Sequence, residues 1–105
     1  MKKLLSPLII LSCLASASAI AANNIVDQRN LQFVQESITI QAGETVIFKN
    51  SDRTAHHIQS KDNGINLNSP LTPPGHEFSY TFDKAGLYTI GCFIHPKMKM
   101  TLTVQ

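Results

Sequence analysis

The sequence has almost no excess of charge once its first residues are set aside. Lys2 and Lys3 account for the formal net charge of +2, and seven basic residues then remain against seven acidic ones. Nucleic-acid-binding domains carry a basic patch or stripe, and this chain has none. The chain also lacks a convincing helical period, an internal repeat and a low-complexity tract. These absences exclude nucleic acid as a partner and disfavour a helical or repetitive fold.

The first 22 residues have the pattern of a secretory signal peptide. Two lysines precede a mostly apolar stretch over residues 4–14, and small residues follow it. The apolar stretch is too short to span a bilayer, so we expect no membrane span. The candidate cleavage sites follow Ala19, Ala21 and Ala22. We therefore expect a signal peptide over residues 1–22, one domain over residues 23–105, and a periplasmic protein.

Cysteine is scarce, and only one cysteine belongs to the expected mature domain. Cys13 lies within the apolar stretch of the signal, where acylation of this cysteine to anchor the protein to lipid is an alternative to its removal. Cys92 then remains alone, which excludes an internal disulfide. An unpaired thiol in an exported protein calls for a chemical role, and binding a metal ion is the natural one.

Short runs of alternating apolar and polar residues cover most of the remaining chain. Such alternation is typical of half-buried strands, and turn residues separate the runs. Residues 23–30 are polar and are expected to be a loosely held terminal segment, and residues 61–74 to be mostly loop. The predicted strands cover residues 31–35, 37–41, 45–50, 55–60, 76–82, 86–90 and 100–104. This pattern predicts an all-β sandwich.

A cluster of metal-binding side chains lies between the last two predicted strands. Cys92, His95 and Met98 offer a thiolate, an imidazole and a thioether within seven residues. Cysteine with methionine favours copper, and one cysteine, two histidines and a weak axial methionine form the blue-copper ligand set. The rest of the chain should therefore supply a second histidine.

The adjacent pair His56 and His57 is the source of that histidine. Neighbouring strand residues point to opposite faces, so only one of the two reaches a site inside the sandwich. His56 shares a face with Ile58, a core candidate, and is preferred over His57. His76 follows a Pro-Pro-Gly turn and is expected on the surface.

The chain resembles the cupredoxins, and within them the amicyanin and plastocyanin branch. The resemblance lies in residues 48–56, 86–92 and 95–98, and extends from about Leu31 to Val104. It implies a Greek-key β-sandwich and one type 1 copper ion that carries single electrons. The ligands that it implies are His56, Cys92, His95 and Met98.

Two positions depart from the family pattern, and a second methionine competes with Met98. The family often has Asn after the upstream histidine and Ser or Thr after the cysteine, whereas this chain has His57 and Phe93. The family's backbone N–H bond to the sulfur can survive at His57, but the side-chain tie to the ligand loop is in doubt. Met100 matches a longer, plastocyanin-like loop, but it shares a face with core residues of the last strand, which favours Met98.

The prediction is an exported, monomeric blue-copper protein that transfers electrons between transient redox partner proteins. The expected electron port is the edge of His95, framed by apolar residues and rimmed by lysines. The framing residues are Leu71, Pro73, Pro74, Ile94 and Pro96, and the lysines are Lys61, Lys97 and Lys99. An enzyme is not expected, because four protein ligands leave no open position for a substrate. The alternatives are a periplasmic copper carrier or storage protein, and a zinc site in which the methionine is idle.

Overall fold

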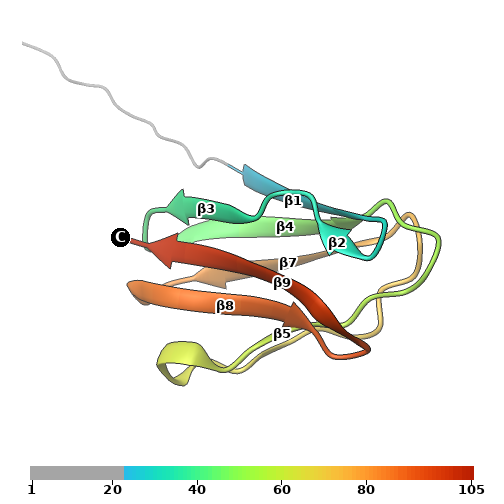
Figure 1. Cartoon of the computed structure of the whole chain (residues 1–105). Helices are drawn as coiled ribbons and strands as arrows, with labels where there is room; N and C mark the ends of the chain where they lie inside the picture. The colour runs from blue at the N-terminus through green and yellow to red at the C-terminus, as the bar shows by residue number, and fades with distance from the viewer. Residues whose placement is uncertain (1–22) are drawn as a thin grey trace, which may run out of the picture.

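The computed structural model describes residues 23–105, which form two β-sheets packed face to face (Figure 1). One sheet has the order β2-β1-β4-β7 and the other β3-β9-β8-β5-β6. The strands are β1 (Asn23–Arg29), β2 (Gln32–Phe33), β3 (Ser37–Ile40), β4 (Glu44–Asn50), β5 (Ile58–Ser60), β6 (Leu67–Asn68), β7 (Glu77–Phe82), β8 (Gly86–Cys92) and β9 (His95–Val104). A short 3-10 turn, η2 (Asp62–Gly64), lies between β5 and β6. The predicted all-β sandwich is confirmed, and the chain passes repeatedly from one sheet to the other, as in a Greek key.

The core lies between the sheets and follows the alternation in the sequence. Along β9 the buried residues are Met98, Met100, Leu102 and Val104, with more exposed residues between them. β8 contributes Tyr88, Ile90 and Cys92 to the same interior. Three phenylalanines lie in this core, and two further aromatic residues pack against it: Phe33, Phe48 and Phe82, with Phe78 and Tyr80. Gly43 takes a positive φ of 94° in the turn before β4, a conformation that glycine adopts without steric cost.

The expectation that residues 23–30 are loosely held was wrong. They form β1, which pairs in parallel with β4 from Asn23↔Thr45 to Gln28↔Asn50. The strand was hard to recognise because one of its fully buried residues is polar. Val26 enters the core, but Gln28 is buried as well and donates its amide N–H to the Lys49 carbonyl over 3.0 Å.

Three predicted strand boundaries also need correction. The strand expected over residues 55–60 is only Ile58–Ser60, because His56 forms an isolated bridge with Thr72. The strand expected over residues 31–35 is only Gln32–Phe33, because Asn30 and Leu31 form a two-residue turn with φ of 53° and 58°. The last strand begins at His95 rather than near residue 100, because Cys92 pairs directly with His95.

Three chain connections gather at the end of the sandwich away from the C-terminus (Figure 1). They are the β1–β2 turn, the β4–β5 connection and the β8–β9 hairpin. The expected signal peptide and Cys13 lie outside the described residues. Among residues 23–105, no helix has the length and apolar character needed to cross a membrane.

Candidate metal centre

The β8–β9 hairpin brings Cys92 and His95 together. The two strands pair as Ile90↔Met100 and Gly91↔Lys99, but the next pair is Cys92↔His95. One step along β8 therefore corresponds to four steps along β9, so residues 96–98 bulge out of the ladder. As a result, Nδ1 of His95 lies 3.5 Å from Sγ of Cys92.

The β4–β5 connection supplies His56 to the same place. His56 is fully buried, and it exchanges two backbone hydrogen bonds with Thr72, of 3.1 and 2.8 Å. The buried Asn50 amide links this connection to the β6–β7 connection, because its Nδ2 donates to the carbonyls of Thr54 and Thr72 over 2.9 Å each. His56 is therefore held in place by two connections that are hydrogen-bonded to each other, rather than by a regular strand.

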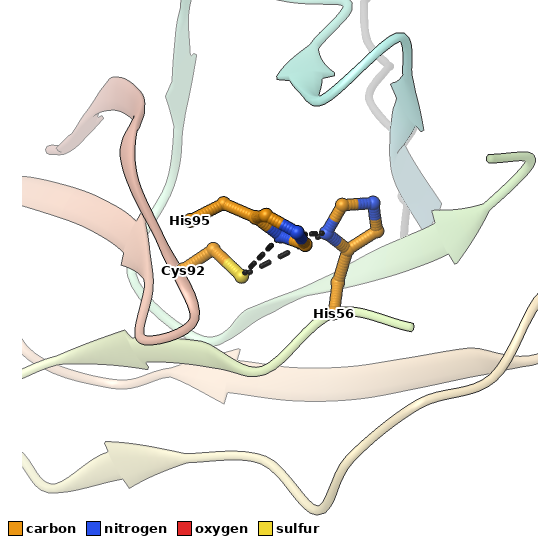
Figure 2. A group of neighbouring side chains, drawn as sticks. All are labelled: His56, Cys92 and His95. Atoms are coloured by element: carbon orange, nitrogen blue, oxygen red, sulfur yellow. Dashed lines mark hydrogen bonds between the residues drawn. The ribbon is translucent and has the colours of Figure 1, made fainter. Parts of the chain in front are cut away.

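The three side chains point toward one another (Figure 2). Nδ1 of His56 lies 3.7 Å from Sγ of Cys92 and 3.2 Å from Nδ1 of His95. A metal ion held at about 2.0–2.3 Å from such atoms would set them roughly 3.5 Å apart if they surrounded it in a plane. The observed triangle, with edges of 3.2, 3.5 and 3.7 Å, fits such an ion. One thiolate with two imidazoles is the trigonal set of blue-copper sites.

Asp52 holds His56 in the form that can bind a metal. Its Oδ2 lies 3.0 Å from Nε2 of His56 and also accepts the N–H of Leu31 over 2.8 Å, while Oδ1 accepts the N–H of Arg53. Burial raises the pKa of Asp52, but these backbone N–H groups and His56 outweigh it, so the pKa lies below its usual value. An ionised carboxylate only accepts hydrogen bonds, so Nε2 of His56 carries the proton. Nδ1 is left with a free lone pair that faces Cys92 and His95.

The backbone of His57 contacts the cysteine, whereas its side chain does not join the triangle. The N–H of His57 donates to Sγ of Cys92 over 3.3 Å, and the carbonyl of His57 accepts the N–H of Phe93 over 2.9 Å. Nε2 of His57 instead lies against Oδ1 of Asn68. The structure thus places His56, and not His57, in the cluster.

Both methionines of β9 are buried on the same face of the strand, but they lie at different levels along it. Met100 is level with Ile90 in the core, whereas Met98 belongs to the bulge next to His95. Met98 and His95 line the same surface hollow. Met98 therefore lies nearer the three-residue cluster along the strand. His76 is exposed just before β7, as expected.

The surroundings of His95 differ in part from the expectation. The hollow beside its half-buried ring is lined by Ile94, Pro96 and Lys97 and also by Leu31, which the sequence did not suggest. Lys61 lies elsewhere, in a separate hollow over the outer face of β8 that Lys99 also lines. Of the three lysines expected to rim the port, Lys97 alone lines the hollow beside His95, while Lys99 lines one neighbouring hollow with Lys97 and another with Lys61.

Sequence reasoning also missed Asp52 and Asn50. Asp52 is four residues before His56, and Asn50 ends β4, so both lie within the segment that resembles the cupredoxins. A carboxylate close to a candidate histidine ligand was the available signal, since metal-binding histidines usually donate their other ring N–H to such a group.

Comparison with known proteins gives consistent matches. Residues 20–105 match the model of the family described as copper binding proteins, plastocyanin/azurin family. A plastocyanin of Scenedesmus fuscus is 37% identical over 90 residues, which cover 75% of this chain and 92% of the relative. An amicyanin of Paracoccus versutus is 26% identical over 94 residues, covering 87% of this chain and 71% of the relative. A solved structure of an oxidised amicyanin mutant superposes with a TM-score of 0.72 at 22% identity, covering 78% of this chain and 81% of that one, and this supports the fold.

Proposed function

Because the chain belongs to the plastocyanin/azurin family of copper-binding proteins, we propose that it holds its one type 1 copper ion through the cluster at the end of the sandwich. The proposed ligands are His56, Cys92, His95 and Met98. The observation that carries the assignment is the triangle of Nδ1, Sγ and Nδ1 atoms with edges of 3.2 to 3.7 Å. Its relatives are electron carriers, and this chain is an electron carrier rather than an enzyme.

Each ligand has a part set by its place in the fold. Copper supplies the one-electron chemistry when it is bound, by alternating between Cu(I) and Cu(II). Cys92 and His56 are buried and fixed by strand β8 and by the Asp52 and Asn50 contacts. Rigid ligands keep the same positions in both oxidation states, so little rearrangement accompanies the transfer of an electron. A site whose ligands are buried and held by hydrogen bonds favours an electron carrier over the alternative of a copper carrier, which must release its ion.

Absorption and EPR spectra of the copper-loaded protein test the ligand set. We expect an intense thiolate-to-copper band that Cys92→Ser and His56→Ala abolish and His57→Ala keeps. A zinc site would give no such band. If His57→Ala removes the band while His56→Ala leaves it, the assignment of the upstream histidine is reversed.

The two methionines are separated by a matched pair of variants. Met98→Leu should change the EPR spectrum and the reduction potential, because it removes the weak axial sulfur. Met100→Leu, at a similarly buried position on the same strand, should leave both nearly unchanged. The opposite result would assign the axial position to Met100.

The proposed electron port is the apolar surface around His95. Leu31 and Ile94 are 48% and 44% exposed beside it, and Leu71 is 61% exposed. An apolar surface of this kind suits brief encounters with redox partner proteins by a monomeric carrier. Lys97 lies in the same hollow and favours an acidic partner. A Lys97→Glu variant should transfer electrons to an acidic partner more slowly at low ionic strength, and a rate unchanged across ionic strength would reject this role.

We also propose that the protein is exported to the periplasm through a cleaved signal peptide over residues 1–22. The basic start, the apolar stretch and the small residues before Asn23 support this proposal. Mass spectrometry of protein from the periplasmic fraction should find an N-terminus within residues 20–23. An intact N-terminus would refute cleavage, and a lipid-modified Cys13 would indicate an anchored protein instead.

A further inference from the structure

The side chain of His57 bridges two parts of the chain beside the cysteine. Its Nε2 lies 2.5 Å from Oδ1 of Asn68, at the end of β6. Its ring also packs against the ring of Phe93, with centroids 5.5 Å apart and planes inclined by 52°. Because an amide oxygen only accepts, Nε2 of His57 carries the proton of that hydrogen bond.

The backbone of the same residue contacts the cysteine and its neighbour. The N–H of His57 points to Sγ of Cys92, and its carbonyl accepts the N–H of Phe93. His57 lies between the isolated bridge His56↔Thr72 and the first residue of β5, where a regular ladder does not fix the backbone. The backbone bonds of His56 to Thr72, of the His57 carbonyl to Phe93 and of Ile58 to Ser69 hold the chain on either side, and the contacts of the His57 side chain add to them in fixing its peptide N–H.

We propose that His57 is a positioning residue: its ring, held by Asn68 and Phe93, keeps the His57 N–H on the sulfur of Cys92. The proposal depends on the proposed role of Cys92 as a copper ligand. His57 and Phe93 occupy the two positions that depart from the family pattern, and the structure joins them to each other. In place of the side-chain tie that the sequence left in doubt, the structure has an aromatic contact with Phe93 and a hydrogen bond to β6.

A hydrogen bond to the sulfur of Cys92 should raise the reduction potential of the bound copper. An N–H donor stabilises negative charge on a thiolate, and this charge is greater when the bound copper is Cu(I). Hydrogen bonding around the cysteine sulfur is one of the means by which such sites set their reduction potential. Loosening the His57 N–H should therefore weaken the binding of Cu(I) relative to Cu(II) and lower the potential.

The variants His57→Ala, Asn68→Ala and Phe93→Ala each remove one part of the bridge and retain the peptide N–H of residue 57. Three exposed residues provide matched controls: His76→Ala, Asn66→Ala and Leu87→Ala. The first readout is amide hydrogen exchange of residue 57, measured by NMR in the metal-free and Cu(I)-loaded proteins. The second is the reduction potential of the copper protein.

We expect exchange at residue 57 to rise by about tenfold in His57→Ala and Asn68→Ala, while exchange at Ile90 in the core stays unchanged. A tenfold loss of Cu(I) over Cu(II) affinity would lower the potential by about 59 mV. The double variant His57→Ala/Phe93→Ala should do little more than His57→Ala alone, because both act through one contact.

The proposal is overturned if exchange at residue 57 stays within twofold of the parent rate and the potential within about 18 mV, the shift of a twofold change in the Cu(I)/Cu(II) affinity ratio, in His57→Ala and Asn68→Ala. It is also overturned if the controls change equally. If His57→Ala does not fold, Asn68→Ala decides, since Asn68 is exposed. Failure of the copper assignment would be seen separately as the absence of a thiolate-to-copper band in the unmodified protein. The exchange rates of the metal-free proteins would still test the bridge in that case.

Discussion

Replacing Asp52 by Asn should damage the copper site although residue 52 is not itself a ligand. The carboxylate accepts hydrogen bonds from Leu31, Arg53 and His56 over 2.8, 2.9 and 3.0 Å. An amide of the same shape has only one accepting oxygen. Whichever way it turns, its NH2 group faces at least one of these N–H donors, and a hydrogen bond is lost.

The loss has two consequences of different size. If the NH2 group faces His56, the donor of this fully buried ring is left unsatisfied, which costs about 1–3 kcal/mol in the free energy of unfolding. The ring then also favours the tautomer with its proton on Nδ1, the atom that points into the site. Removing such a support for a metal-binding histidine lowers metal affinity by about 10–100-fold.

Copper affinity is measured by competition with a chelator of known affinity, and stability by urea unfolding of the metal-free protein. Asp83→Asn is the matched control, because Asp83 is an exposed carboxylate in the turn between β7 and β8. We expect it to match the parent protein in both measurements. An amide that keeps its oxygen on His56 and Leu31 would spare the site, so Asp52→Ala, which removes both oxygens, decides the point. The reasoning about the tautomer of His56 is refuted if Asp52→Ala binds copper within twofold of the parent while Asp83→Ala does the same.

Three further predictions concern stability. Leu31→Gly should raise the free energy of unfolding by about 0.5–1 kcal/mol, because Leu31 has φ of 58° in a hairpin turn that favours glycine. Leu31→Ala keeps the strained backbone and should give no gain in stability when both variants are unfolded in urea. Asn50→Ala should lower the free energy of unfolding by about 2–4 kcal/mol, because it leaves the carbonyls of Thr54 and Thr72 without their donor. An equal loss in Asn66→Ala, at an exposed position, would contradict this. Stability should also fall in acid, because the pKa values of Asp27 and Asp52 are lower in the folded protein than the ordinary value of 3.8. Burial raises both pKa values, but hydrogen bonds and charged partners lower them by more. A lowered pKa contributes stability above the unfolded value that is lost as the pH falls through the folded value, so the melting temperature of the metal-free protein should decline below about pH 4, and a flat profile would contradict this.

The local parts of this fold could be predicted from the sequence because each strand carries its own alternation. Cys92, His95 and Met98 are within seven residues, so their spacing alone was enough to indicate a metal site. The choice of His56 followed from the two faces of a strand, since Ile58 two residues later had to enter the core.

The parts that could not be predicted depend on polar residues with partners far along the chain. β1 was missed because Gln28 is buried with its partner at Lys49, and an apolar pattern does not reveal such a pair. The turn at Leu31 was predicted as strand because leucine rarely takes a positive φ, and the carboxylate of Asp52 that accepts its N–H is 21 residues away. Such contacts are set by tertiary packing rather than by local preference.

The central claim is that two imidazoles, one thiolate and a weaker thioether surround a single copper ion. X-ray absorption at the copper edge of the reconstituted protein counts these neighbours directly. We expect one copper per chain with two imidazole nitrogens and one short sulfur, and the short sulfur should vanish in Cys92→Ser. A copper ion with no sulfur neighbour, or a set of neighbours that Cys92→Ser leaves unchanged, would contradict the account.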